Sequence, residues 1–188
     1  MNKPNNYDST PAKSDNKRIE PGPHIAILKT VTEMLSSGGR PMIRVEIDFA
    51  PEDQQAGYFK EVYDADTRLD KKWPFLATHY ILSEDNDGNT TRAFKSFCSA
   101  FEDSNDRMIE WGPAFEKNFP GRKIGVVYGD VEEEYQGRII DRTRIRWFFD
   151  THKAADQKTP DKKALKKHSE PTPAFVDFNV DGDDVPFR

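Results

Sequence analysis

The sequence predicts an all-β domain with one helix, flanked by disordered N- and C-terminal tails. Three observations support this fold class. Strand-like stretches recur along residues 22–149, only one long segment in that range repeats with a helical period, and apolar residues make up only 35% of the chain. A compact domain holds roughly 45–50% apolar residues, counted with glycine. Because prolines and charges gather at the ends, we expect residues 1–21 to form a disordered arm and residues 150–188 a flexible tail.

The first two strands are expected between residues 24 and 49. Residues 24–32 (HIAILKTVT) favour a strand, and the Ser36–Pro41 segment breaks it. Residues 42–49 then alternate strictly, with four apolar side chains on one face: Ile43, Val45, Ile47 and Phe49. A period of two is typical of a half-buried strand, so the pair predicts a hairpin.

A third strand and the helix are expected in the middle of the chain. The strand is predicted at Tyr58–Tyr63 (YFKEVY), and the connection after it holds one candidate strand at Ala77–Leu82. The helix is predicted at residues 90–102, where Thr90 or Thr91 can serve as the N-cap. Its apolar side chains recur at i, i+3, i+4 and i+7: Phe94, Phe97, Cys98 and Phe101. A further helical turn is expected at Trp111–Phe119.

Two last strands, Lys123–Glu132 and Ile139–Phe149, complete the order β-β-β-α-β-β. This is the order of the OB-fold, a five-stranded Greek-key barrel that commonly binds oligonucleotides. An SH3-like barrel or a lone α+β sheet fits the same count of elements. We therefore expect residues 22–149 to form a domain of the OB type.

Composition excludes several classes of chemistry. The net charge of −5 counts against a generally basic nucleic-acid binder, so any binding surface must concentrate its cations. A single cysteine cannot form an internal disulfide, and the four histidines lack zinc-ligand spacing. Asp64 and Asp66 lack the further ligands of a nuclease centre. We expect no cofactor, no metal and no catalytic residues, in a soluble protein of a reducing cytoplasm without signal peptide or membrane span.

The last predicted strand carries the first candidate DNA-binding residues. Three arginines and a phenylalanine alternate onto one face: Arg142, Arg144, Arg146 and Phe148. Such a face can follow phosphates while aromatic rings stack on bases. The alternative is a solvated face whose arginines pair with Glu132, Glu133 and Glu134 across the hairpin.

The second candidate surface lies between residues 58 and 75, where aromatic and basic side chains interleave as in a base-stacking groove. Its candidate residues are Tyr58, Lys60, Arg68, Lys71, Lys72, Trp73 and Phe75. Half of the rings on a strand must also face the core. Trp73, in a charged segment, is the ring least easily explained as core.

The C-terminal tip has a specific pattern, in which Asp181, Asp183 and Asp184 precede Val185-Pro186-Phe187. It resembles the tip of bacterial single-stranded DNA-binding proteins, and the resemblance implies recruitment of replication and repair proteins. One departure is Arg188, which follows the phenylalanine that ends the chain in that family. The alternative is an acidic tail that aids solubility.

The domain itself resembles an uncharacterised phage and prophage family found in replication and recombination modules. The resemblance rests on Gly57-Tyr58-Phe59, the Asp66–Trp73 run (DTRLDKKW), and residues 94–105 and 121–137. It implies single-stranded DNA binding by an OB-fold, a bacteriophage or prophage origin and the host cytoplasm; a homo-oligomer is compatible with it. The alternative function is a recombination mediator or helicase-loading accessory protein with little DNA affinity of its own.

Overall fold

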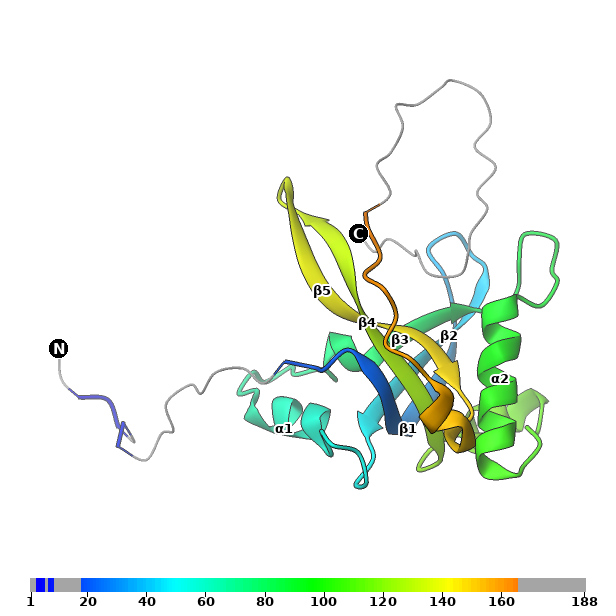
Figure 1. Cartoon of the computed structure of the whole chain (residues 1–188), viewed down its shortest axis with the longest axis horizontal. Coiled ribbons are helices and arrows are strands. Elements are labelled where there is room, and N and C mark those ends of the chain that lie inside the picture. The colour runs from blue at the N-terminus through cyan, green and yellow to red at the C-terminus, as the bar shows by residue number, and fades with distance from the viewer. Residues whose placement is uncertain (1–2, 6, 9–17, 166–188) are drawn as a thin grey trace, which may run out of the picture.

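The computed structural model describes residues 3–5, 7–8 and 18–165, which contain one five-stranded antiparallel sheet (Figure 1). The spatial order of the strands is β3-β2-β1-β4-β5. Their bounds are β1 Gly22–Leu35, β2 Pro41–Phe49, β3 Thr78–Leu82, β4 Lys123–Tyr135 and β5 Arg138–Phe149. The mostly β fold class is thus confirmed. Within the described residues no ladder joins the edge strands β3 and β5, so the sheet is not closed.

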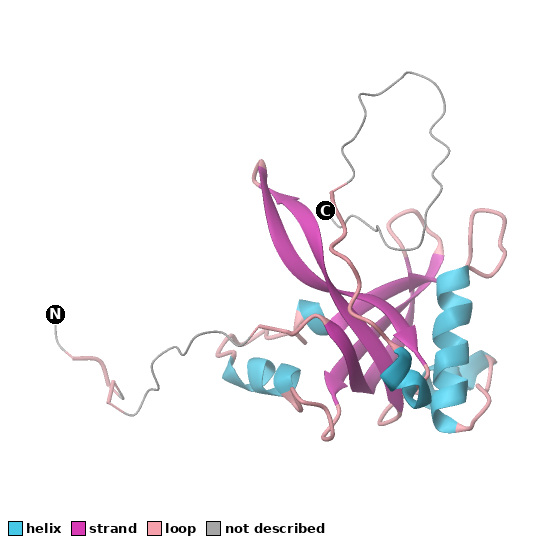
Figure 2. Cartoon of the chain, viewed as in Figure 1, coloured by secondary structure: helices cyan, strands magenta, loops and turns pink. Residues whose placement is uncertain are grey.

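Two α-helices and three short 3₁₀ helices accompany the sheet (Figure 2). They are α1 Tyr58–Ala65, α2 Arg92–Asn105, η1 Phe75–Ala77, η2 Gly112–Asn118 and η3 Thr151–Asp156. The predicted helix is confirmed as α2, and the Thr91 hydroxyl accepts a hydrogen bond from the Phe94 N–H as its N-cap. No helix in the described part of the chain is long and apolar enough to cross a membrane.

The strand predicted at Tyr58–Tyr63 is wrong, because this segment forms α1. Only Phe59 is buried, and it packs against Phe49 of β2 with 5.0 Å between ring centroids. The Asp48 carboxylate accepts a hydrogen bond from the Phe59 N–H, which ties the first turn of α1 to the end of β2. The third strand is instead β3, which corresponds to the candidate strand predicted at Ala77–Leu82.

The core lies between the sheet and α2. Phe97 and Phe101 of α2 are fully buried, and both rings pack against Phe119, which follows η2. Cys98 is buried on the same helix face, and burial raises the pKa of its thiol to about 12. The predicted place of Cys98 on the apolar face of this helix is thereby confirmed. Ile19 also belongs to the core, although it precedes the predicted domain boundary.

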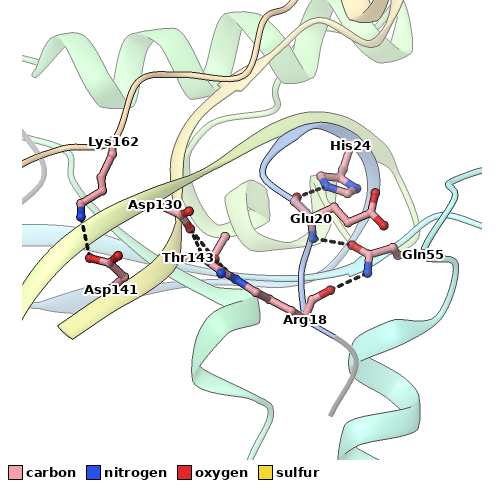
Figure 3. Close-up of polar contacts among 8 residues, drawn as sticks. All are labelled: Arg18, Glu20, His24, Gln55, Asp130, Asp141, Thr143 and Lys162. Atoms are coloured by element: carbon pink, nitrogen blue, oxygen red, sulfur yellow. Dashed lines mark hydrogen bonds and ion pairs between the residues drawn. The ribbon is translucent and has the colours of Figure 1, made fainter. Parts of the chain in front are cut away.

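A buried ion pair fixes the start of β1 to the loop after β2. The His24 Nδ1 lies 3.1 Å from an Asp53 carboxylate oxygen, and both side chains are almost fully buried. The His24 Nε2 lies 2.8 Å from the Glu20 carbonyl oxygen (Figure 3). Acceptors therefore face both ring nitrogens. Burial alone would lower the His24 pKa, but the hydrogen bonds to Asp53 and Glu20 raise it overall. Asp53 also accepts the backbone N–H groups of Ile25 and Gln55.

This pair predicts a specific pH dependence of stability. Because the His24 pKa is raised in the folded protein, its contribution is complete below pH 6.5 and is lost as the pH rises through the folded pKa. The Asp53 pKa is lowered, so its contribution is complete above pH 3.8 and is lost as the pH falls through its folded pKa. Asp53→Asn should therefore destabilise most between these two values, by about 3–5 kcal/mol.

Urea denaturation at several pH values measures this difference. Asp156→Asn, which removes an exposed carboxylate from η3, is the matched control and should leave the profile unchanged. If Asp53→Asn lowers the free energy of unfolding by the same amount at pH 5.5 and at pH 9, the result would contradict the assigned ion pair.

Candidate nucleic-acid interface

Trp73 occupies an intermediate position between core and surface. Its indole N–H donates a hydrogen bond to the Ile47 carbonyl oxygen over 2.8 Å, and its ring lies 5.4 Å from that of Tyr63. The Lys29 ammonium sits 3.8 Å from the centre of the Trp73 ring. The Lys71 ammonium lies 4.4 Å from the Tyr63 ring. Two rings and two cations thus form one contiguous surface between α1 and β1.

A second pair of rings and cations lies along the β4–β5 hairpin. The Arg144 guanidinium lies 4.9 Å from the ring of Phe75, which is 59% exposed. The Arg142 guanidinium lies 5.8 Å from the Tyr135 ring near the hairpin turn. Both arginines pair with Glu133, Arg144 through two hydrogen bonds of 2.6 and 2.8 Å and Arg142 through a contact of 3.2 Å. The predicted alternative, pairing across the hairpin, therefore holds for these two arginines.

We call these residues together the aromatic–cation band, which comprises Lys29, Tyr63, Lys71, Trp73, Phe75, Tyr135, Arg142 and Arg144. Between residues 18 and 165 every cation–π contact belongs to it. Trp73 and Phe75 are two residues apart, so one short segment joins the α1 side of the band to the hairpin side. In Figure 1, α1 and the free end of the hairpin lie on the same side of the molecule, away from α2.

Three members of the band are missing from the residues predicted from the sequence: Lys29, Tyr63 and Tyr135. Lys29 lies at a β-bulge: Leu28 pairs with Ile47 and Thr30 with Glu46, so Lys29 has no partner on β2. A bulge re-aims a side chain, and here it places the ammonium over Trp73. Tyr135 was overlooked because it was assigned to the turn between the last two strands.

Phe148 lies in the core and not on the exposed face predicted from the alternation of the last strand. A second bulge explains the error: Val127 pairs with Trp147 and Tyr128 with Ile145, so the extra residue Arg146 resets the alternation of β5. Phe148 is only 8% exposed, and its ring lies 5.2 Å from that of Phe97.

Arg146 is separated from the other two arginines by the same bulge. Its Nη1 lies 3.4 Å from the Asp161 carbonyl oxygen, and its side chain covers Gly129, where an added Cβ would lie 3.1 Å from the Arg146 Cγ. It therefore contacts the C-terminal segment rather than the band.

The remaining predicted residues of the 58–75 segment have other surroundings. Tyr58 packs against the core, and burial raises its pKa. Lys60 pairs with Asp64 one helical turn away. Arg68 pairs with Asp66 at 2.6 Å and, through this hydrogen bond, lowers the pKa of that carboxyl to about 2. Lys72 is exposed. The structure thus brings Lys71, Trp73 and Phe75 into the band and leaves these four outside it.

The hairpin has a second, acidic face that cations from both chain ends neutralise (Figure 3). Asp130 pairs with Thr143 and Glu132 with Asp141 across the strands, which places all four side chains on one face. The Arg18 guanidinium lies 2.6 Å from Asp130. The Lys162 ammonium lies 2.8 Å from both Glu132 and Asp141, and these two hydrogen bonds raise its pKa.

The segment that carries Lys162 pairs with the backbone of β4. The Lys163 N–H donates to the Asp130 carbonyl and the Glu132 N–H donates to the Lys163 carbonyl, each over 2.9 Å. Pro160 lies against Gly129, where an added Cβ would approach its ring to 2.5 Å. We call residues 157–165 the strap. The strap belongs to the predicted flexible tail, yet it extends the sheet along the edge of β4 that β1 leaves free.

Comparison with known proteins adds no relative, since no family model matches the chain and no curated protein shows a significant match. Among the described residues no group of three or more His, Cys, Asp or Glu could hold a metal ion. The predicted partner-binding residues Asp181, Asp183, Asp184, Val185, Pro186 and Phe187 lie outside the described residues.

Lys162→Met should loosen the hairpin while preserving its fold. The substitution keeps an apolar stem of similar length, but leaves Glu132 and Asp141 opposite each other without a counter-ion, and like charges directly opposite destabilise a strand pair. Hydrogen exchange should show several-fold faster exchange of the Glu132 amide. Lys158→Met, at an exposed position of the same strap, is the matched control. Equal protection of the Glu132 amide in both variants would contradict the role of Lys162 as the counter-ion that stabilises the hairpin.

Proposed function

We propose that the chain is a single-stranded DNA-binding protein. The observation that carries the proposal is the aromatic–cation band, in which four partly exposed rings each contact a lysine or arginine. Single-stranded DNA is bound by the same combination, because bases stack on rings and cations neutralise the adjacent phosphates. Duplex DNA offers no unpaired base faces, so the band favours single strands.

The order of the elements supports an OB-type barrel as the scaffold. In that fold a helix lies between the third and fourth strands, as α2 does, and the third and fifth strands close the barrel. Here side chains bridge the gap between β3 and β5: the His79 and Phe148 ring centroids lie 5.7 Å apart, and Arg144 covers Phe75 of η1. We propose that this gap belongs to the binding surface, since the band crosses it.

The mechanism involves stacking and charge neutralisation, without covalent chemistry or a cofactor. The Asp181–Phe187 tip would recruit replication and recombination proteins through its carboxylates and the Phe187 ring. This role rests on the resemblance of the tip, as do the phage or prophage origin and the host cytoplasm.

One observation favours the alternative, an accessory protein of recombination or helicase loading with little DNA affinity. Arg142 and Arg144 already share Glu133, and phosphates would have to compete with that carboxylate. The two functions differ in one measurable property, the direct binding of an oligonucleotide by the isolated protein.

We expect the full chain to bind oligo(dT) well above duplex DNA of equal length. Log affinity should fall with log salt concentration at about 0.7 per phosphate neutralised. Fluorescence anisotropy at several salt concentrations measures both quantities. Equal affinity for the duplex would reject the proposed function, and no binding at low salt would reject it in favour of the accessory protein.

Glu133→Gln should raise the affinity for oligo(dT) and steepen the salt dependence. The substitution removes the carboxylate that Arg142 and Arg144 share, so both guanidinium groups become available to phosphates. Glu134→Gln is the matched control, because it removes the same charge from the next residue, which is exposed and points to the other face of β4. If both variants gain equally, the gain reflects net charge alone and the arginines do not contact DNA.

A further inference from the structure

A groove lies beside the Phe94 end of α2. In Figure 1, α2 lies on the side of the molecule away from α1 and the hairpin. Its volume is about 450 Å³. The end of β1, the start of β2, Ser83 and Glu84 after β3, Phe94 of α2 and the segment from Trp111 to Phe115 line it. None of these lining residues belongs to the aromatic–cation band, so the groove is a separate surface.

The groove combines a rigid floor with an exposed tryptophan. Met42, Phe94 and Phe115 of the floor are each less than 9% exposed. Trp111 stacks on Phe115 with 5.4 Å between centroids and 21° between ring planes, and its edge faces Phe94. The Trp111 side chain is nevertheless 62% exposed, and Leu35 on the opposite wall is 64% exposed. Tryptophan, with tyrosine and arginine, is enriched among the few residues that carry most of the binding energy of an interface.

The charge of the groove is negative. Glu33 and Glu84 line it, and among the described residues that line it there is neither lysine nor arginine. Glu116 adds a third carboxylate nearby, since it accepts a hydrogen bond from the Glu33 N–H over 2.7 Å. A phosphate backbone would be repelled by these groups. The acidic tip of the same chain, with Asp181, Asp183 and Asp184, would be repelled as well.

We infer that this groove docks a segment of a partner protein in which an apolar or aromatic anchor is flanked by lysine or arginine. The anchor would cover Trp111 and Leu35, and the flanking cations would meet Glu33 and Glu84. Met34 and Met42 line the same surface, and flexible thioether side chains adapt to anchors of different shape. The chain would then hold DNA on one side and a protein on the other, with no overlap of the two surfaces.

A pair of short labelled peptides tests the inference on the full chain. Both carry a Leu-Phe-Leu centre; one has flanking lysines and the other has flanking glutamates. We expect the lysine peptide to bind about tenfold more tightly, and to shift the amide NMR signals of residues 33–35, 42–43, 83–84, 111–112 and 114–115. Trp111→Ala should weaken it about tenfold, as expected for an anchor contact.

Two further variants keep the test decisive. Trp147→Ala, which removes an exposed tryptophan of β5, should leave peptide binding unchanged. Glu33→Gln with Glu84→Gln should abolish the preference for lysine without removing the apolar floor, and it covers the case in which Trp111→Ala disturbs the fold. Equal binding of both peptides, or binding of neither, would overturn the inference. So would oligo(dT), or a second copy of the chain, if either shifted the same amide signals.

Discussion

The whole arrangement depends on how the central strand β1 is shared. β2 pairs with it from Ala26 to Leu35, whereas β4 pairs only with its first part, from Gly22 to Ile27. Because of this offset, β1 after Ile27 and β4 after Tyr128 each have an edge that the other strand does not pair with. The strap covers the free edge of β4, and η2 lies along the free edge of β1, where Glu116 accepts the Glu33 N–H. An unpaired strand edge invites uncontrolled association, so each cover also protects the fold.

The offset of β1 also positions both candidate surfaces. The bulge at Lys29 lies where β1 loses β4, and it directs the ammonium onto Trp73. The far end of the same strand supplies Met34 and Leu35 to the groove. The buried His24–Asp53 pair holds the first residues of β1 in place. The Glu20 carbonyl oxygen also contacts the His24 ring, and Arg18, two residues before Glu20, pairs with Asp130 of the hairpin. One strand thus links the core to the aromatic–cation band and to the groove.

The prediction from sequence was correct where apolar residues recur with one spacing over a long stretch. It failed where that stretch is short or interrupted. Residues 42–49 and the Phe94–Phe101 stripe are long enough to distinguish a period of two from 3.6. The Tyr58–Tyr63 segment is too short for this distinction, because the spacing of Phe59 and Tyr63 fits both a strand and a helix. The two bulges leave no mark in the sequence, and they account for the misplaced Phe148 and the overlooked Lys29. Only the tertiary fold brings Trp111 and Leu35 to the same groove, so the sequence alone could not predict it.

The acidic net charge is compatible with a phosphate-binding surface because the hairpin separates its carboxylates by face. Asp130, Glu132 and Asp141 lie on one face, where Arg18 and Lys162 from the two chain ends neutralise them. Glu133 lies on the other face and holds Arg142 and Arg144 in fixed orientations beside Tyr135 and Phe75. A shared carboxylate competes with a phosphate, but it also pre-orients two guanidinium groups, which lowers the entropy lost on binding. Under the proposed function, the balance between these two effects would determine how tightly the hairpin holds DNA, and it makes Glu133 the residue on which the two candidate functions diverge.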